Sequence, residues 1–164
     1  MYQTGLDRLD LNILKVLQTD GRLSNAKIGG KVGLSESATF ARLKRLEKSG
    51  AIVGFPGQLD LKKVSAHVIV FTLITLEDDR NEQLRRFENQ VAESPEITEC
   101  HYISGGFDYL LTSVAPDFER YMQVIDAIRE ANDNIRQYSS FLSVRKTKQT
   151  PASLDVLTGH NNSR

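Results

Sequence analysis

Residues 24–50 read SNAKIGGKVGLSESATFARLKRLEKSG. Ser24 and Ser35 are both favourable helix N-caps, and apolar residues follow each of them at helical spacing. Gly33 lies between the two segments and Gly50 follows the second, where a left-handed residue commonly ends a helix. The stretch therefore predicts two helices joined by a tight turn, which is a helix-turn-helix pattern.

An earlier helix precedes this pair, because Asp7 can cap a helical pattern that stops at residues 20–21. In the third helix we expect Phe40, Leu43 and Leu46 to face the core, which leaves small, hydroxyl-bearing and basic side chains outside. Small residues can approach base edges, and hydroxyl and basic groups bind phosphates. The predicted DNA contacts are Ser35, Ser37, Ala38, Thr39, Arg42, Lys44 and Arg45.

The charge distribution agrees with a polyanion-binding N-terminal part. The chain has 164 residues, with 21 Lys/Arg, 21 Asp/Glu and no formal net charge. Residues 1–50 nevertheless hold nine basic and five acidic side chains, whereas the remainder holds 12 basic and 16 acidic ones. A basic module on an acidic body indicates that only the first part meets nucleic acid.

The rest of the chain is interpreted as a second domain at residues 64–148, after a linker of Gly, Pro and polar residues at 53–63. Strands are expected at residues 66–76, 97–104, 107–115 and 135–146, and helices at residues 80–93 and after Asp117. This β-α-β-β-α-β order is the split βαβ, or ferredoxin-like, pattern. The polar tail at residues 149–164 has little periodicity, and we expect it to be mobile.

The stretch SGGFDYLL at residues 104–111 separates two of these strands. If Gly105 and Gly106 form a two-residue hairpin loop, Ile97 shares a face with Leu110, and both faces of the hairpin carry apolar or aromatic side chains. Two helices cover only one face of a four-stranded sheet. We therefore expect the open face to pack on another subunit.

Several classes of function lack their motifs. The sequence has no nucleophile elbow, no phosphate-binding GxxxxGK[ST], no HExxH and no CxxC pair, so we predict no catalytic residue, no metal site and no cofactor. Cys100, the single cysteine, and His101 lack further ligands at a compact spacing and are expected to be structural. No apolar run approaches the roughly 20 residues that span a bilayer, and no signal peptide is visible, so a cytoplasmic location is expected.

Several separated motifs keep a common order and spacing, namely LDxxDxxIL, DGRxSN, VGLS, RLKRLEKSGxI and SGGFDYLL. With them the chain resembles the Lrp/AsnC (leucine-responsive/asparagine-synthesis regulator) family over about residues 6–147. The resemblance implies an α+β protein with an N-terminal (winged) helix-turn-helix domain at residues 1–52 and a C-terminal βαββαβ ferredoxin-like (RAM) domain.

The sequence departs from the family pattern at three places. Glu36 stands where proline is common, and Pro56-Gly57 interrupts a linker that is normally extended. Gly29 and Gly30 lie inside the second helix, where an interior glycine costs roughly 0.5–1 kcal/mol relative to alanine. We therefore expect this helix to be locally weak.

The glycines of SGGFDYLL have a second possible use, because a turn without side chains exposes amide N–H groups that can bind a carboxylate. Asp108 beside them can receive an ammonium, which would give the two ends of an α-amino acid complementary partners. In the family that this chain resembles, the matching loop lines an effector pocket at a subunit interface. The resemblance thus implies an amino-acid effector bound by Ser104, Gly105, Gly106, Phe107, Asp108 and Tyr109, with Tyr138, Ser139 and Ser140 as a further candidate contribution from the partner subunit.

The sequence thus predicts a sequence-specific, DNA-binding transcriptional regulator that responds to an amino acid or related metabolite. Its expected partners are double-stranded DNA and further copies of itself, as a homodimer or a higher oligomer such as a tetramer or octamer. Two alternatives remain open: an amino-acid-sensing module that controls a protein partner, and a small enzyme on the ferredoxin-like fold. The basic third helix disfavours the first, and the missing catalytic set disfavours the second.

Overall fold

A computed structural model describes residues 5–159 of the chain, and these residues fall into two compact units. The helical unit combines the chain up to Gln58 with the chain from Lys148 onward. The sheet unit is Leu59–Thr147. Each unit has its own cluster of buried apolar side chains, as expected of a domain that folds around its own core.

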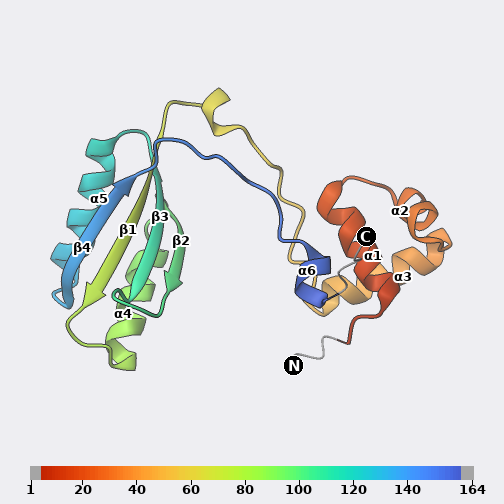
Figure 1. The fold of residues 1–164 in the computed structure, drawn as a ribbon, viewed down its shortest axis with the longest axis horizontal. Coiled ribbons are helices and arrows are strands. Elements are labelled where there is room, and N and C mark those ends of the chain that lie inside the picture. The colour runs from red at the N-terminus through yellow and green to blue at the C-terminus, as the bar shows by residue number, and fades with distance from the viewer. Residues whose placement is uncertain (1–4, 160–164) are drawn as a thin grey trace. The chain divides into compact units, whose positions relative to one another are not determined.

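The helical unit contains α1 (Arg8–Thr19), α2 (Asn25–Val32) and α3 (Glu36–Lys48), shown in red to orange in Figure 1. Each helix begins at a side-chain cap that was expected from the sequence, namely Asp7, Ser24 and Ser35. The helices pack around the buried Ile13, Ile28, Leu43 and Leu46, which confirms the predicted helix-turn-helix. No strand follows α3 at residues 51–60, so the described part of this unit has no β-wing.

The predicted inner face of α3 is wrong at Phe40. Its side chain is 51% exposed, whereas its neighbour Thr39 is fully buried. Thr39, Leu43 and Leu46 follow one another at intervals of four and three residues, which puts them on one side of the helix. A step of one residue turns the next side chain by about 100°, so Phe40 is directed away from this core.

Gly29 allows α2 to approach the turn before α3 closely. A Cβ atom on Gly29 would lie 2.5 Å from the carbonyl oxygen of Leu34 and 2.9 Å from Oγ1 of Thr39. The same region is held by a 2.9 Å hydrogen bond from the backbone N–H of Leu34 to the carbonyl of Gly29. A Cβ on Gly30 would meet nothing within 4 Å. The pair expected to weaken α2 therefore contains one glycine that the packing requires and one that it does not.

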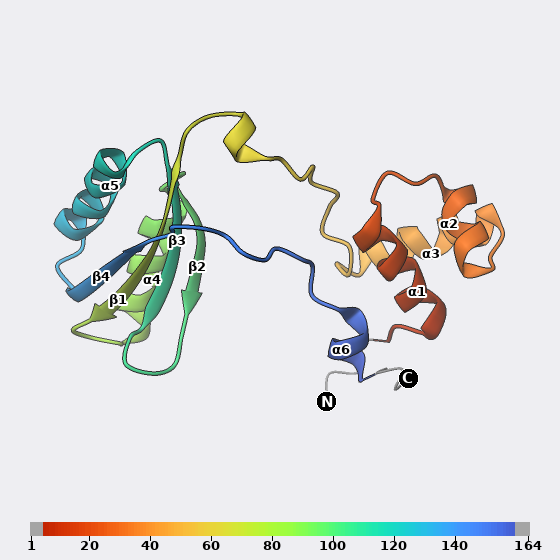
Figure 2. The same cartoon turned by 45° about the horizontal axis from the view of Figure 1, so that its top comes forward.

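The expectation that residues 149–164 form a mobile tail is wrong for the described part, which contains helix α6 (Leu154–Thr158). Figures 1 and 2 show α6, in blue, beside α1. Nζ of Lys15 lies 2.5 Å from the Asp155 carboxylate, and Nε2 of Gln18 donates a 3.1 Å hydrogen bond to the carbonyl of Ala152. Tertiary contacts of this kind stabilise a helix too short to persist alone. Residues 160–164 lie outside the described part.

The sheet unit has four antiparallel strands in the spatial order β2-β3-β1-β4. They are β1 (Val68–Leu76), β2 (Ile97–Tyr102), β3 (Tyr109–Ala115) and β4 (Ile135–Leu142), and the helices are α4 (Asn81–Ala92) and α5 (Phe118–Ala131). This is the predicted βαββαβ order, with both helices on one face (Figure 1). A short 3₁₀ helix, η1 (Leu61–Lys63), lies within the segment that was expected to be a linker.

The pairing of β2 with β3 agrees with the predicted register near the turn, where Tyr102 pairs with Tyr109. The register shifts by one residue between Ile97 and Glu99, so that Ile97 pairs with Ser113. Ile97 consequently packs on the helix-covered core and not on the face of Leu110, which corrects the predicted face. A bulge of this kind reverses the side on which one side chain points.

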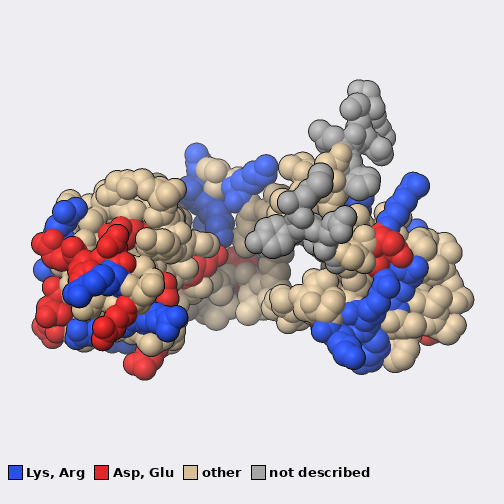
Figure 3. Space-filling model, turned by 90° about the horizontal axis from the view of Figure 1, so that it is seen from below, with Lys and Arg blue, Asp and Glu red and all other residues tan. Residues whose placement is uncertain are grey.

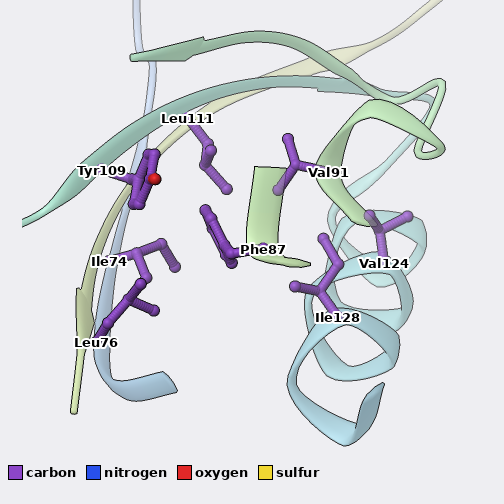
Figure 4. Packing of buried hydrophobic residues seen from close by; sticks show 8 residues of the cluster. All are labelled: Ile74, Leu76, Phe87, Val91, Tyr109, Leu111, Val124 and Ile128. Carbon is purple, nitrogen blue, oxygen red and sulfur yellow. The ribbon is translucent and has the colours of Figure 1, made fainter. Parts of the chain in front are cut away.

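The main core lies between α4, α5 and the covered face of the sheet. Phe87 of α4 is fully buried, and its ring centroid is 4.6 Å from that of Tyr109 on β3. Figure 4 shows Phe87 between Tyr109 and Ile74 of the sheet on one side and Ile128 of α5 on the other. This packing holds the two central strands in place, and with them the loop between β2 and β3.

Candidate DNA interface and effector loop

Two of the predicted DNA contacts form the start of α3. The hydroxyl of Ser35 accepts a 3.2 Å hydrogen bond from the backbone N–H of Ala38, which caps the helix. The hydroxyls of Ser35 and Ser37 lie 3.2 Å apart and share a hydrogen bond. Ser37 is exposed, and Ala38 is half-buried. The first turn of α3 therefore presents short side chains around a well-defined helix terminus.

Thr39 lies in the core and not on the outer surface. Its Oγ1 donates a 2.9 Å hydrogen bond to the carbonyl of Ser35, and its side chain is fully buried against Gly29. It can therefore position the turn before α3, but in this conformation it has no surface to offer a ligand.

Arg42 and Arg45 bind α1 through the buried carboxylate of Asp10. Nη1 of Arg42 lies 2.8 Å from Oδ1 of Asp10, and Nη2 of Arg45 lies 2.7 Å from Oδ1 and 2.5 Å from Oδ2. Nη1 of Arg42 also lies 2.6 Å from Oδ2 of Asp7. The side chain of Asp10 has no exposed surface, and a buried carboxylate is costly unless it is paired with positive charge. The two guanidinium groups supply that positive charge.

The same contacts shift the pKa values of Asp7 and Arg42. The hydrogen bond from Arg42 and that from the backbone of Asp10 lower the pKa of Asp7 below its ordinary value. The hydrogen bonds to Asp7 and then Asp10 raise the pKa of Arg42. Both shifts favour the ionised pair, so the link between α3 and α1 is charged at neutral pH.

The outward face of α3 differs from the predicted set. It carries exposed side chains that follow one another at helical spacing, namely Ser37, Phe40, Ala41, Lys44, Arg45 and Lys48. Phe40, Ala41 and Lys48 were not among the predicted contacts. If Thr39 is taken as the inner residue in place of Phe40, helical spacing from Ser37 puts these three residues on the outer face.

Basic side chains gather on one face of the helical unit, shown in blue in Figure 3. On α3, Nζ of Lys44 lies 5.8 Å from the ring centroid of Phe40 and 3.6 Å from Oε2 of Glu47. Both Lys44 and Glu47 are exposed, and a surface ion pair of this length restrains a lysine only weakly. The ammonium of Lys44 is thus available to a phosphate.

The loop between β2 and β3 is anchored by Asp108. Its backbone N–H donates a 2.8 Å hydrogen bond to the carbonyl of Ile74, and its Oδ2 accepts a 2.7 Å hydrogen bond from the backbone N–H of Leu76. The carbonyl of Asp108 accepts from the N–H of Ile103 at 2.8 Å. These bonds tie the loop to the end of β1.

The glycines of the loop face open space. Gly105 has φ +138°, a conformation that L side chains rarely adopt. A Cβ on Gly105 or Gly106 would meet nothing within 4 Å. Neither glycine is therefore required by packing within the subunit, and the backbone of residues 104–107 is open to a ligand or to a second chain.

The other candidate effector residues lie on both faces of the sheet. Tyr109 faces the helices, its hydroxyl donates a 2.9 Å hydrogen bond to Oε1 of Glu88, and burial raises its pKa. On β4, Tyr138 and Ser140 also face the helices, against Arg129 and Tyr121 respectively. Ser139 lies between them and so belongs to the open face. Ile74, whose carbonyl binds the N–H of Asp108, pairs with Tyr109 on one side and with Tyr138 on the other, so both tyrosines lie at the loop end of the sheet but on its helix-covered face.

A hollow of about 340 Å³ lies between α4 and the edge strand β2, lined by residues that include Glu88, Val91, Ile97, Cys100 and Tyr102. Burial, and then the charge of Glu88, raise the pKa of the Cys100 thiol to about 11. The thiol therefore stays protonated at neutral pH and is a poor nucleophile. Among residues 5–159, no group of three or more His, Cys, Asp or Glu side chains could hold a metal ion. No helix in this range is long and apolar enough to cross a membrane.

A helix-turn-helix unit with an exposed basic helix face, joined to a βαββαβ unit, defines a DNA-binding regulator. Residues 6–47 match the model of the AsnC-type helix-turn-helix domain, and residues 69–153 match that of the Lrp/AsnC ligand binding domain. The chain belongs to the Lrp/AsnC family of transcriptional regulators.

Relatives and solved structures agree with this assignment. Transcriptional regulatory protein DoeX of Halomonas elongata is 34% identical over 151 residues, which are 92% of this chain and 96% of that protein. The leucine-responsive regulatory protein of Escherichia coli K12 is 35% identical over 145 residues, 88% of each chain. An AsnC family transcriptional regulator from Agrobacterium tumefaciens superposes with a TM-score of 0.84 at 36% identity, covering 93% of this chain and 99% of that one. A transcriptional regulator of Neisseria meningitidis, solved as a complex with L-Met, gives a TM-score of 0.83 at 27% identity with the same coverage.

Proposed function

We propose that this regulator binds double-stranded operator DNA as a homodimer through the outward face of α3, and that an amino acid or related metabolite controls the binding. The observation that carries the proposal is the attachment of α3 to α1 through buried Asp10, which holds the exposed face in a fixed position. A cytoplasmic location and the absence of catalytic activity belong to the same proposal.

The outward face of α3 suits a major groove. Ser37 and Ala41 are small enough to let the helix approach base edges, while Lys44 and Lys48 extend toward phosphates. Arg42 and Arg45 hold the helix through Asp10, and Arg45, whose side chain is 57% exposed, can also meet a phosphate. A dimer would place two such helices on half-sites separated by about one helical turn of DNA, or a multiple of it.

DNA binding can be tested with the DNA upstream of the protein's own gene, with unrelated DNA as competitor and a salt titration. The double substitution Lys44→Ala and Lys48→Ala should weaken binding to all sequences and reduce the salt slope of the dimer by about four, because two phosphate contacts are lost in each subunit. Lys62→Ala, an exposed lysine of η1, serves as the matched control and should change neither quantity. Salt-independent binding with equal affinity for unrelated DNA would refute the proposal.

A dimer is supported by the open face of the sheet. Strands β1, β3 and β4 leave apolar side chains on the face without helices, among them Ile69, Phe71, Leu73, Leu110, Val114 and Phe141. Phe71 and Phe141 pair across strands and are 39% and 54% exposed. Exposed apolar surface of this kind is typical of a protein interface, and a second copy supplies a matching apolar face by symmetry.

The oligomer is tested by light scattering on the size-exclusion peak. Phe71→Glu places a charge in the proposed interface and should shift the mass toward a monomer at micromolar concentration. Phe118→Glu is the matched control, since Phe118 is 47% exposed but lies on α5. An unchanged mass for Phe71→Glu would exclude the open face as the dimer interface. Wild-type mass also distinguishes a dimer from a tetramer or octamer.

An amino-acid site at residues 104–109 is supported by the open backbone of Gly105 and Gly106 and by the relative that was solved with L-Met. Oδ2 of Asp108 is taken by the N–H of Leu76, and within the described residues Oδ1 has no hydrogen-bond partner. We propose that the loop amides bind the effector carboxylate and that Oδ1 receives its ammonium. The partner subunit would complete the pocket, with residues 138–140 as candidates.

Two substitutions of Asp108 separate ligand binding from loop anchoring. Asp108→Asn keeps an oxygen for the N–H of Leu76 but removes the charge, and should abolish the effect of amino acids on DNA affinity while the protein stays folded. Asp108→Ala also removes the anchor and should lower the melting temperature in addition. A panel of amino acids in the DNA-binding assay provides the readout. A full response in Asp108→Asn would show that the carboxylate does not bind the effector.

A further inference from the structure

Both arginines of α3 have a guanidinium nitrogen engaged by the carboxylate of Asp10 on α1. Bidentate recognition of guanine commonly uses arginine, but both arginines of α3 are bound to Asp10. If either guanidinium turned toward a base, part of the charge that balances a fully buried carboxylate would be lost. The short Ser37 and Ala41 reach only a little beyond the helix surface. The other long side chains of this face are therefore candidates for base discrimination.

Phe40 is the largest side chain on this face. It lies in the second turn of α3, in the N-terminal half of the helix that contacts base edges in helix-turn-helix proteins. Half of its surface is exposed although it stands one residue from buried Thr39. Nζ of Lys44, one turn further along, lies 5.8 Å from the ring centroid and restrains the ring by a cation–π contact. Phe40 does not belong to the core of the helical unit, so its ring is an exposed and restrained aromatic group on this surface.

We propose that Phe40 is a specificity residue that contacts the 5-methyl group of a thymine in each half-site. This inference rests on the proposed DNA binding through α3. Thymine is the base that presents an apolar group in the major groove, and phenylalanine is among the side chains that contact it. Lys44 holds the ring on one side and contacts a phosphate, which carries no sequence information. The ring therefore selects A·T pairs at a defined position.

The test replaces single methyl groups in the DNA. A binding site is first selected from a random DNA pool with the full-length protein, and each thymine is then replaced in turn by deoxyuridine, which lacks only the methyl group. One thymine in each half-site should show an affinity loss of about fourfold per half-site, the effect of one buried methyl-sized group. In Phe40→Ala the same replacement should have no effect.

Three further variants control for indirect effects. Phe40→Leu keeps an apolar side chain and should retain the dependence on the methyl group. Lys48→Ala removes a proposed phosphate contact without touching the Phe40 ring, so it should weaken binding to both DNAs alike and leave their ratio unchanged. Phe40→Gln should lose the methyl dependence, and it takes the place of Phe40→Ala if that variant does not fold in a thermal melt.

The possible failures are distinguishable. If the protein selects no DNA from the pool, both the proposed function and this inference fail. If it selects DNA but no thymine is sensitive to loss of its methyl group, or the sensitivity persists in both Phe40→Ala and Phe40→Gln, the role of Phe40 is refuted while DNA binding stands.

Discussion

Gly29 and Gly30 are adjacent in α2, yet alanine should have opposite effects at the two positions. Gly30→Ala adds a methyl group to open space and removes the entropic cost of glycine inside a helix. Gly29→Ala adds the same group 2.5 Å from the carbonyl oxygen of Leu34 and 2.9 Å from Oγ1 of Thr39. The first of these atoms belongs to the backbone, so the turn before α3 must move.

The magnitudes follow from these surroundings. Alanine in place of an interior helical glycine stabilises by roughly 0.5–1 kcal/mol, and this is the whole expected effect at Gly30. At Gly29 overpacking typically costs about 1–3 kcal/mol, and a 2.5 Å approach to a backbone oxygen belongs in the upper part of that range, about 2–3 kcal/mol, so after the helix gain we expect a net loss of about 1–2 kcal/mol. For a unit of this size each kcal/mol shifts the melting temperature by roughly 4–8 °C.

Differential scanning calorimetry of the full chain gives the measurement, with the transition of the sheet unit as an internal reference. We expect Gly30→Ala to raise the melting temperature of the helical unit by about 2–8 °C and Gly29→Ala to lower it by about 4–16 °C. A shift of the same sign in both variants would refute the reasoning, since the two substitutions have the same intrinsic helix propensity and differ only in what the methyl group meets.

Three further outcomes test the helical unit. Asp10→Asn removes the charge that Arg42 and Arg45 share and should destabilise the unit by about 3–5 kcal/mol, measured by chemical unfolding; a loss below about 1 kcal/mol would mean that the buried ion pairs are not formed. Asp155→Asn breaks the exposed pair with Lys15 and should cost less than about 1 kcal/mol in the same assay, so a larger loss would show that α6 is held by this pair alone. Arg42 lowers the folded-state pKa of Asp7, so ionised Asp7 stabilises the folded unit fully at pH values above the unfolded pKa of about 3.9. This contribution to the free energy of unfolding disappears as the pH falls through the lowered folded value. The melting temperatures of wild type and Asp7→Asn, which keeps a cap, should therefore differ above about pH 4, and the difference should shrink as the pH falls below that value. A difference that stays constant at every pH would exclude this linkage.

The helix-turn-helix and the order of the sheet unit could be predicted because their signals are local. Helical spacing of apolar residues and the caps Asp7, Ser24 and Ser35 lie within each element. The βαββαβ order likewise follows from the alternation of strand-like and helical stretches. Periodicity and caps of this kind do not depend on contacts between distant parts of the chain.

The errors arose where a distant residue decides the outcome. Phe40 is more apolar than Thr39, but only Thr39 fits the space that Gly29 leaves free on α2. The DNA contacts predicted at Arg42 and Arg45 stay a prediction, and what the sequence did not reveal is their carboxylate partner, which lies 32 and 35 residues earlier in the chain. The charge pattern of α3 alone does not reveal such a partner. The acidic residue in the first turn of α1 could have been considered as a partner for the two arginines.

The remaining differences have the same origin. Helix α6 is too short to be recognised from its own periodicity, and its contacts to Lys15 and Gln18 cross most of the sequence. The position of Ile97 depends on a one-residue bulge that alternation alone cannot locate. The role of residues 104–109 depends on a second subunit, so their assignment as an effector site stays a prediction.

The contact of α6 with α1 also orders events during synthesis. Helices α1–α3 are completed by a segment that is synthesised much later, because α6 belongs to the helical unit. On the order of 100 residues separate α3 from α6, which at about 5–20 residues per second corresponds to roughly 5–20 s of translation. Throughout that interval the α1 surface that will receive α6 is uncovered on the nascent chain, and it can close only after the whole sheet unit has been synthesised.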